Sequence, residues 1–228
     1  MPPPPDWLTE FWSVPRIWPG ETVAILCGGE SLTPEDVNYL RDRCRVIAIN
    51  RAYVRAPWAD WLFACDAGRF WQWCGGPGRL YPAEPDAWDF AGLKITVWSP
   101  SLIPPHVEHL RKLLDARPEV RVIRHAGDNR HEGESGDPGV LYGNNSLYQL
   151  LSVIRFTGAR RVLLLGADML GGHWHPPWPM GGPNFPRSVV PKFTSLVEPL
   201  ARAKVEVINC SPGSALEAFP KRELREVL

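Results

Sequence analysis

Short apolar runs recur along the chain, and stretches with helical spacing separate them. Each run is continuously apolar rather than alternating, which is typical of strands in a parallel sheet covered on both faces. The strands are expected at Thr22–Cys27, Arg45–Asn50, Trp61–Cys65, Leu93–Trp98, Val120–Arg124, Arg161–Gly166 and Val205–Asn209. Helices are expected at about Pro34–Arg43, Pro104–Ala116, Ser146–Thr157, Ser188–Ala203 and Ser214–Phe219, with a short one after Asp66. The alternation predicts an α/β fold with a doubly wound, mostly parallel sheet and helices on both faces.

The domain organisation is expected to be simple. Residues 1–20 form a Pro-rich N-terminal arm, and residues 21–228 form one domain. Long loops rich in Pro and Trp are expected at Trp71–Pro85 and His173–Pro191, and a polar, Gly-rich, mobile loop at Asn129–Gly143. The aromatic side chains expected to attach the arm to the domain are Trp7, Phe11, Trp12 and Trp18.

Composition narrows the range of partners. The 228 residues are 44% hydrophobic and 22% charged, as in an ordinary globular domain. Lys plus Arg and Asp plus Glu each number 25, so no basic excess indicates a nucleic-acid or membrane surface. No apolar run approaches the length of ~20 residues that a membrane span needs. The five cysteines lack metal-ligand spacing, which favours reduced thiols in a cytoplasmic protein.

A small-residue turn follows the first predicted strand. The turn reads Gly28-Gly29-Glu30-Ser31, and a helix start with Thr33 as cap follows it directly. Free backbone N–H groups in such a turn can bind an anion, and glycine lets a phosphate approach closely. The spacing matches neither a dinucleotide fingerprint nor a Walker P-loop. The alternative interpretation is a tight turn without a ligand.

Polar or small residues also follow the other predicted strands. In a doubly wound sheet a ligand lies beyond the carboxyl ends of the strands, so these residues are expected to converge on one edge. The candidates for contact with a nucleotide-type ligand are Gly28, Gly29, Ser31, Asn50, Arg51, Asp66, Ser211, Gly213 and Ser214.

Two further clusters extend the candidate site. Asn144, Asn145 and Ser146 precede a predicted helix, where they either cap it or contact ribose, base or phosphate. His173 and His175 follow the strongest strand. Either histidine could act as a general base, because the ordinary pKa of histidine lies near neutrality. A metal site that includes Asp168 and a purely structural loop are the alternatives.

Several of these motifs occur in the same order as in known families. The chain from about Thr22 to Pro220 resembles the small Rossmann-like bacterial sialyltransferases and the superfamily around 6-hydroxymethylpterin diphosphokinase. The resemblance lies in the Gly-Gly-Glu-Ser-Leu turn and in segments Ile47–Tyr53, Cys65–Asp66, Gly143–Asp168 and Asn209–Leu216. The whole pattern is also similar to uncharacterised tailed-phage proteins with a His-Trp-His loop at this place.

The resemblance implies a Rossmann-like fold and a glycosyltransferase-like enzyme. A CMP- or UDP-linked sugar donor would bind at Gly28, Gly29, Ser31 and Asn50, with no further cofactor. His173 or His175 would deprotonate an unknown hydroxyl acceptor, for which a modified DNA base is one option. A phage-encoded protein would act in the host cytoplasm.

Two rival functions stay open. The first is ATP-dependent diphosphate transfer, which requires Mg²⁺ and therefore needs acidic ligands such as Asp66 and Asp168 to converge. The second is a non-catalytic nucleotide-binding protein, for example a phage assembly component. The Trp-rich loops could in either case form the interface of a homo-oligomer.

Overall fold

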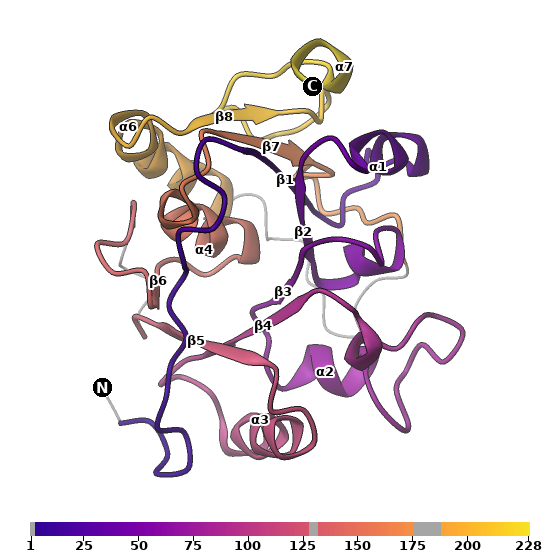
Figure 1. The fold of residues 1–228 in the computed structure, drawn as a ribbon, viewed down its shortest axis with the longest axis vertical. Coiled ribbons are helices and arrows are strands. Elements are labelled where there is room, and N and C mark those ends of the chain that lie inside the picture. The colour runs from indigo at the N-terminus through magenta and orange to yellow at the C-terminus, as the bar shows by residue number, and fades with distance from the viewer. Residues whose placement is uncertain (1–2, 128–131, 176–187) are drawn as a thin grey trace.

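All strands within the described part of the chain belong to one parallel sheet. The computed structural model describes residues 3–127, 132–175 and 188–228. Its sheet has eight strands in the order β6-β5-β4-β3-β2-β1-β7-β8, and every neighbouring pair is parallel (Figure 1). The strands are β1 (Thr22–Leu26), β2 (Arg45–Ile49), β3 (Trp61–Ala64), β4 (Leu93–Trp98), β5 (Arg121–His125), β6 (Val140–Leu141), β7 (Arg161–Leu165) and β8 (Glu206–Asn209).

Helices connect the strands and cover the sheet. The α-helices are α1 (Pro34–Leu40), α2 (Arg69–Cys74), α3 (Pro104–Ala116), α4 (Ser146–Val153), α6 (Thr194–Arg202) and α7 (Leu224–Val227). Short 3-10 helices are η1 (Asn50–Val54), η2 (Ala87–Asp89), η3 (Ile154–Thr157) and η4 (Val190–Phe193). Within the described ranges, no helix has the length and apolar character that a membrane span requires.

The core consists of two apolar clusters, one on each face of the sheet. Successive residues of β1 alternate between them: Val23 and Ile25 face the cluster beneath α4 and α6, whereas Ala24 and Leu26 face the one beneath α1, α2 and α3. Figure 1 shows the two helix groups on opposite sides of the sheet. Burial on both faces explains why the strands read as continuous apolar runs.

The N-terminal arm contributes side chains to both apolar clusters, Leu8 and Phe11 to the one beneath α1, α2 and α3, and Trp12 and Trp18 to the one beneath α4 and α6. Trp18 is buried and stacks against Trp61, with ring centroids 4.3 Å apart. Trp12 meets the same indole edge to face at 5.5 Å, and Phe11 contacts Trp98 at 5.6 Å. Trp7 is 38% exposed, so it contributes less to the attachment than the buried Trp18.

The α/β, Rossmann-like, doubly wound fold predicted from the sequence is confirmed. The loop expected at Asn129–Gly143 lies outside the described residues at positions 129–131, and its remainder contains β6, a strand of two residues that pairs with β5. The expected terminal helix at Ser214–Phe219 is wrong, because the Ser214 hydroxyl accepts a hydrogen bond from the Leu216 amide at 2.9 Å and fixes a turn. Helix α7 forms nearer the end of the chain.

Replacing Trp18 tests the attachment of the arm. Trp18→Ala should lower the free energy of unfolding by about 3–5 kcal/mol, because a buried indole leaves a cavity against Trp61. Trp7→Ala, the matched control, should change it by less than about 0.5 kcal/mol. Urea unfolding measures both values, and equal effects would contradict this account of the arm.

Candidate functional site

The candidate site lies where the order of the strands reverses. From β1 the chain moves through β2 to β6 on one side, and β7 and β8 return to the other side of β1. Because all strands are parallel, their carboxyl ends share one edge, and a crevice is expected at this reversal. The prediction that the strand ends share one edge is confirmed, and their order along it is Asp66, Asn50, Gly28, Asp168, Asn209.

The glycine turn after β1 is a point of close approach to β7. The Gly29 amide donates to the Gly166 carbonyl at 2.8 Å. A Cβ atom on Gly29 would lie 2.4 Å from that oxygen and 2.6 Å from the Asp168 carboxyl carbon. Gly166 itself has a φ of +65°, which favours glycine. The sequence of both turns is therefore dictated by packing between two strand ends.

Asp168 ties the two turns together. Its carboxylate accepts the Ser31 amide at 2.9 Å and also the Ser31 hydroxyl. The turn amide that a phosphate could use is thus occupied by a protein carboxylate. The amides of Gly28 and Glu30 have no acceptor among the described residues, so they are the donors left for a ligand.

Ser211 and Ser214 brace the same turn from the side of β8. The Ser211 hydroxyl accepts the Ala167 amide at 3.0 Å, and the Ser214 hydroxyl donates to the Ala167 carbonyl at 2.6 Å. Both side chains are buried. Both hydroxyl groups were expected to contact a ligand, but they instead position the backbone next to Asp168. Gly213, by contrast, is exposed and has open space around it.

Two histidines lie over Gly28 with their rings stacked. The centroids of His173 and His175 are 5.0 Å apart and the rings are 11° from parallel. The His173 Nδ1 lies 3.1 Å from the Gly28 carbonyl oxygen, and the Trp174 amide donates to the same oxygen at 3.1 Å. A Cβ on Gly28 would come within 2.9 Å of His173 Nδ1, so glycine leaves room for the imidazoles.

The tautomer of His173 follows from its partner. A carbonyl oxygen can only accept, so Nδ1 carries the proton and donates to Gly28. The neutral ring then has its lone pair at Nε2. His173 is exposed, which makes this nitrogen accessible from the edge of the sheet. An oriented imidazole with an accessible lone pair is the arrangement of a general base.

Arg51 lies beneath His175 rather than at the surface. It is 1% exposed, forms an ion pair with Glu84, and lies 3.8 Å above the Tyr81 ring. Its Nη1 is 3.2 Å from His175 Nδ1. Burial lowers the pKa of Arg51. The prediction that Arg51 contacts a ligand phosphate conflicts with this burial, which leaves it a supporting role.

Asn50 and Asp66 follow the two neighbouring strands, β2 and β3, at the same edge of the sheet. Asn50 has a φ of +50°, a left-handed conformation that asparagine tolerates better than most residues. Asp66 accepts the Arg69 amide at 3.2 Å and so caps the start of α2. Three strand spacings separate Asp66 from Asp168, roughly 14 Å. One ion cannot bridge them, and the described residues contain no group of three His, Cys, Asp or Glu that could hold a metal.

The cluster before α4 also reaches this edge. The Ser146 hydroxyl donates to the Cys65 sulfur at 2.9 Å, which fixes the start of α4 beside the end of β3. The Asn145 side chain caps α4 by accepting the amides of Leu147 and Tyr148. Asn144 alone of the three predicted residues is exposed.

The cysteines do not provide a nucleophile. Burial raises the pKa of every thiol: to about 12 for Cys27, Cys74 and Cys210 and to about 11 for Cys44 and Cys65. Asp168 adds to the effect at Cys27, the cysteine next to the glycine turn. These thiols therefore stay protonated near neutral pH.

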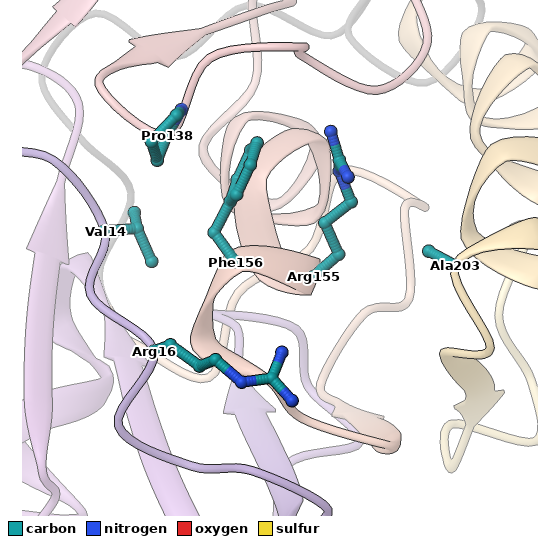
Figure 2. Close-up of a pocket in the computed structure, with 6 residues that line it drawn as sticks. All are labelled: Val14, Arg16, Pro138, Arg155, Phe156 and Ala203. Carbon is teal, nitrogen blue, oxygen red and sulfur yellow. The ribbon is translucent and has the colours of Figure 1, made fainter.

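A cavity of about 400 Å³ lies away from these residues. Figure 2 shows its lining by the arm and by η3, with Ala203 across from them. Since η3 precedes β7 and Ala203 precedes β8, the cavity lies at the amino edge of the sheet, opposite the candidate site. The lining residues are Val14, Arg16, Pro138, Arg155, Phe156 and Ala203.

Sequence reasoning missed Glu84 and Tyr81, which hold Arg51. Both lie in a Pro-rich stretch without apolar periodicity, so no pattern linked them to the strand ends. The signal that could have drawn attention to them is a cation directly after a buried strand, because such a cation requires a partner when it is covered.

Substituting glycine tests the close approach of the two turns. Gly29→Ala should cost about 1–3 kcal/mol of stability, because its Cβ would collide with the Gly166 backbone oxygen. Gly213→Ala meets no atom within 4 Å and should be neutral. Thermal unfolding compares the two variants; a stable Gly29→Ala protein would show that the strand ends are not packed this closely.

The raised thiol pKa values predict alkaline destabilisation. Between about pH 9 and 11 the unfolded chain loses thiol protons that the folded chain retains, so stability falls as pH rises. Urea midpoints at pH 8 and pH 10 measure the fall. It should be smaller in Cys27→Ala, and an equal fall in both proteins would argue against a protonated, buried Cys27.

Comparison of the chain with family models, with curated proteins and with solved structures gives no match. The features that bear on function are the shared edge of the strand ends, the glycine turn and the oriented histidine.

Proposed function

We propose that the protein is a glycosyltransferase-like enzyme that uses a nucleotide-sugar donor and His173 as general base. The observation that carries the proposal is the bond from His173 Nδ1 to the Gly28 carbonyl. It directs the Nε2 lone pair away from the backbone at the edge where an α/β sheet of this topology binds ligands.

The proposed reaction needs few groups. His173 Nε2 takes the proton of the acceptor hydroxyl as its oxygen attacks the anomeric carbon. The bond from that carbon to the donor phosphate breaks, and the phosphate leaves with the electron pair. The amides of Gly28 and Glu30 are the donors that would stabilise charge on the departing phosphate.

His175 is less suited to the role of base than the sequence suggested. It is 6% exposed, and its Nδ1 lone pair already accepts from Arg51. His173 is exposed and has no such partner at Nε2 among the described residues. Asp168 is engaged with Ser31, so we assign it to holding the turn rather than to proton transfer.

The rival functions have less support. Diphosphate transfer from ATP would need Asp66 and Asp168 around one Mg²⁺, and three strand spacings between them, roughly 14 Å, oppose that. A non-catalytic binding protein would not need an oriented histidine over the glycine turn. We also place the reaction in the cytoplasm, because all five cysteines are free thiols.

A thermal-shift panel tests the donor. CMP-, UDP- and GDP-linked sugars are compared with ATP plus Mg²⁺, each at a concentration well above a typical dissociation constant. One of the nucleotide sugars should raise the melting temperature, since a ligand that binds only the folded state stabilises it. Stabilisation by ATP plus Mg²⁺ alone would reject the glycosyltransferase proposal.

His173→Ala tests the base. Hydrolysis of the stabilising nucleotide sugar should slow by about 10²–10⁴-fold, the usual contribution of a general base, while the thermal shift by that donor persists. His109→Ala, on α3 and away from the reversal of strand order, serves as the matched control and should retain the rate. Unchanged hydrolysis in His173→Ala would remove His173 from the reaction.

A further inference from the structure

An ion pair between the buried Arg51 and the half-buried Glu84 lies beside His175. Arg51 enters it from η1, and Glu84 enters it from the loop between α2 and η2. The Arg51 Nε to Glu84 Oε2 distance is 3.1 Å, and a second, closer bond joins Nη2 to Oε1. The Tyr81 ring covers the guanidinium at 3.8 Å. A two-bond contact of this kind fixes the plane of the guanidinium.

The fixed guanidinium determines which nitrogen of His175 bears the proton. Arginine has donors and no acceptor, so the 3.2 Å contact from Nη1 requires a lone pair at His175 Nδ1. The ring proton of the neutral imidazole is then at Nε2. A proton at Nδ1 would instead point at the guanidinium N–H donors, so the arrangement excludes the Nδ1–H tautomer.

His175 in turn supports His173. The two rings are stacked at 5.0 Å, and Trp174 between them in sequence donates its amide to Gly28. The Trp174 indole meets the His175 ring edge to face and lies 4.0 Å below the Arg55 guanidinium. The orientation of the exposed His173 ring therefore depends on a buried neighbour whose own orientation depends on Arg51.

We propose that Arg51, held by Glu84, is a positioning residue that locks His175 as the Nε2–H tautomer and thereby seats His173 as the proton acceptor. The positioning role in transfer rests on the proposed function, whereas the tautomer assignment does not. His173 thus presents a lone pair at Nε2, whereas His175 carries a proton at its own Nε2.

The test begins with the histidine tautomers in the protein without added ligand. Two-dimensional ¹⁵N NMR of histidine side chains should show protonation at Nδ1 for His173 and at Nε2 for His175. Arg51→Met removes the donor and should convert His175 to a mixture of tautomers. Arg117→Met is the matched control, because Arg117 likewise pairs with a carboxylate, Asp89, at 3.5 Å and lies over an aromatic ring, that of Trp88.

Chemical modification gives a second, independent readout. Diethylpyrocarbonate reacts with an accessible imidazole lone pair, so His173 should be modified at least about ten times faster than His175. In Arg51→Met the rates at the two residues should approach each other, and in Arg117→Met they should not. Peptide mass spectrometry locates each modified ring.

Glu84→Gln and Arg51→Lys keep the test decisive if Arg51→Met does not fold. Glu84→Gln removes the charge that fixes the guanidinium plane, and Arg51→Lys replaces the planar guanidinium by an ammonium group on a flexible stem, so both should release the His175 tautomer. A wild-type His175 protonated at Nδ1, or a locked tautomer in every variant, would overturn the proposal. A locked wild-type tautomer in a protein that hydrolyses no donor would instead reject the proposed function alone.

Discussion

The contact between the ends of β1 and β7 is the constraint on which the rest of the site depends. The two strands are adjacent in the sheet, although the contacting residues Ser31 and Asp168 lie 137 positions apart in the chain. Their turns approach so closely that Gly29 has no room for a side chain. Asp168 then bonds across the gap to Ser31. Any movement of one turn is thus transmitted to the other.

The contact between Asp168 and Ser31 also affects the electrostatics at the carboxyl edge of the sheet. An Asp168 carboxylate occupies the Ser31 amide, so the turn differs from anion sites in which every amide awaits a phosphate. A ligand phosphate could bind only the amides of Gly28 and Glu30, and it would lie near the negative charge of Asp168. Arg51 does not offset that charge at the surface, because its own charge is balanced by Glu84. Recognition would rely on positioned hydrogen bonds more than on net attraction.

The fold was predictable because burial on both faces of the sheet leaves a simple trace in the sequence. Continuous apolar runs marked the strands, and parallel pairing placed Asp66 and Asp168 at one edge. Two features left no such trace. Strand β6 has two residues, too few for a periodic pattern. The partner of Arg51 lies in a loop, and loop conformation depends on tertiary contacts that a periodic pattern does not record.

The two borders of the sheet have a consequence for the behaviour of the protein at high concentration. An open border strand exposes unpaired backbone groups on which another chain can build a fibril. At one border β6 presents a ladder of only two residues. At the other border, the segment after β8 folds back so that Lys221 forms a backbone bridge with Asn209. The Lys221 ammonium group donates to the Ser214 carbonyl beside this bridge. The shortness of β6 and the lysine next to β8 both disfavour pairing with strands of another chain, so they oppose aggregation through the edges of the sheet.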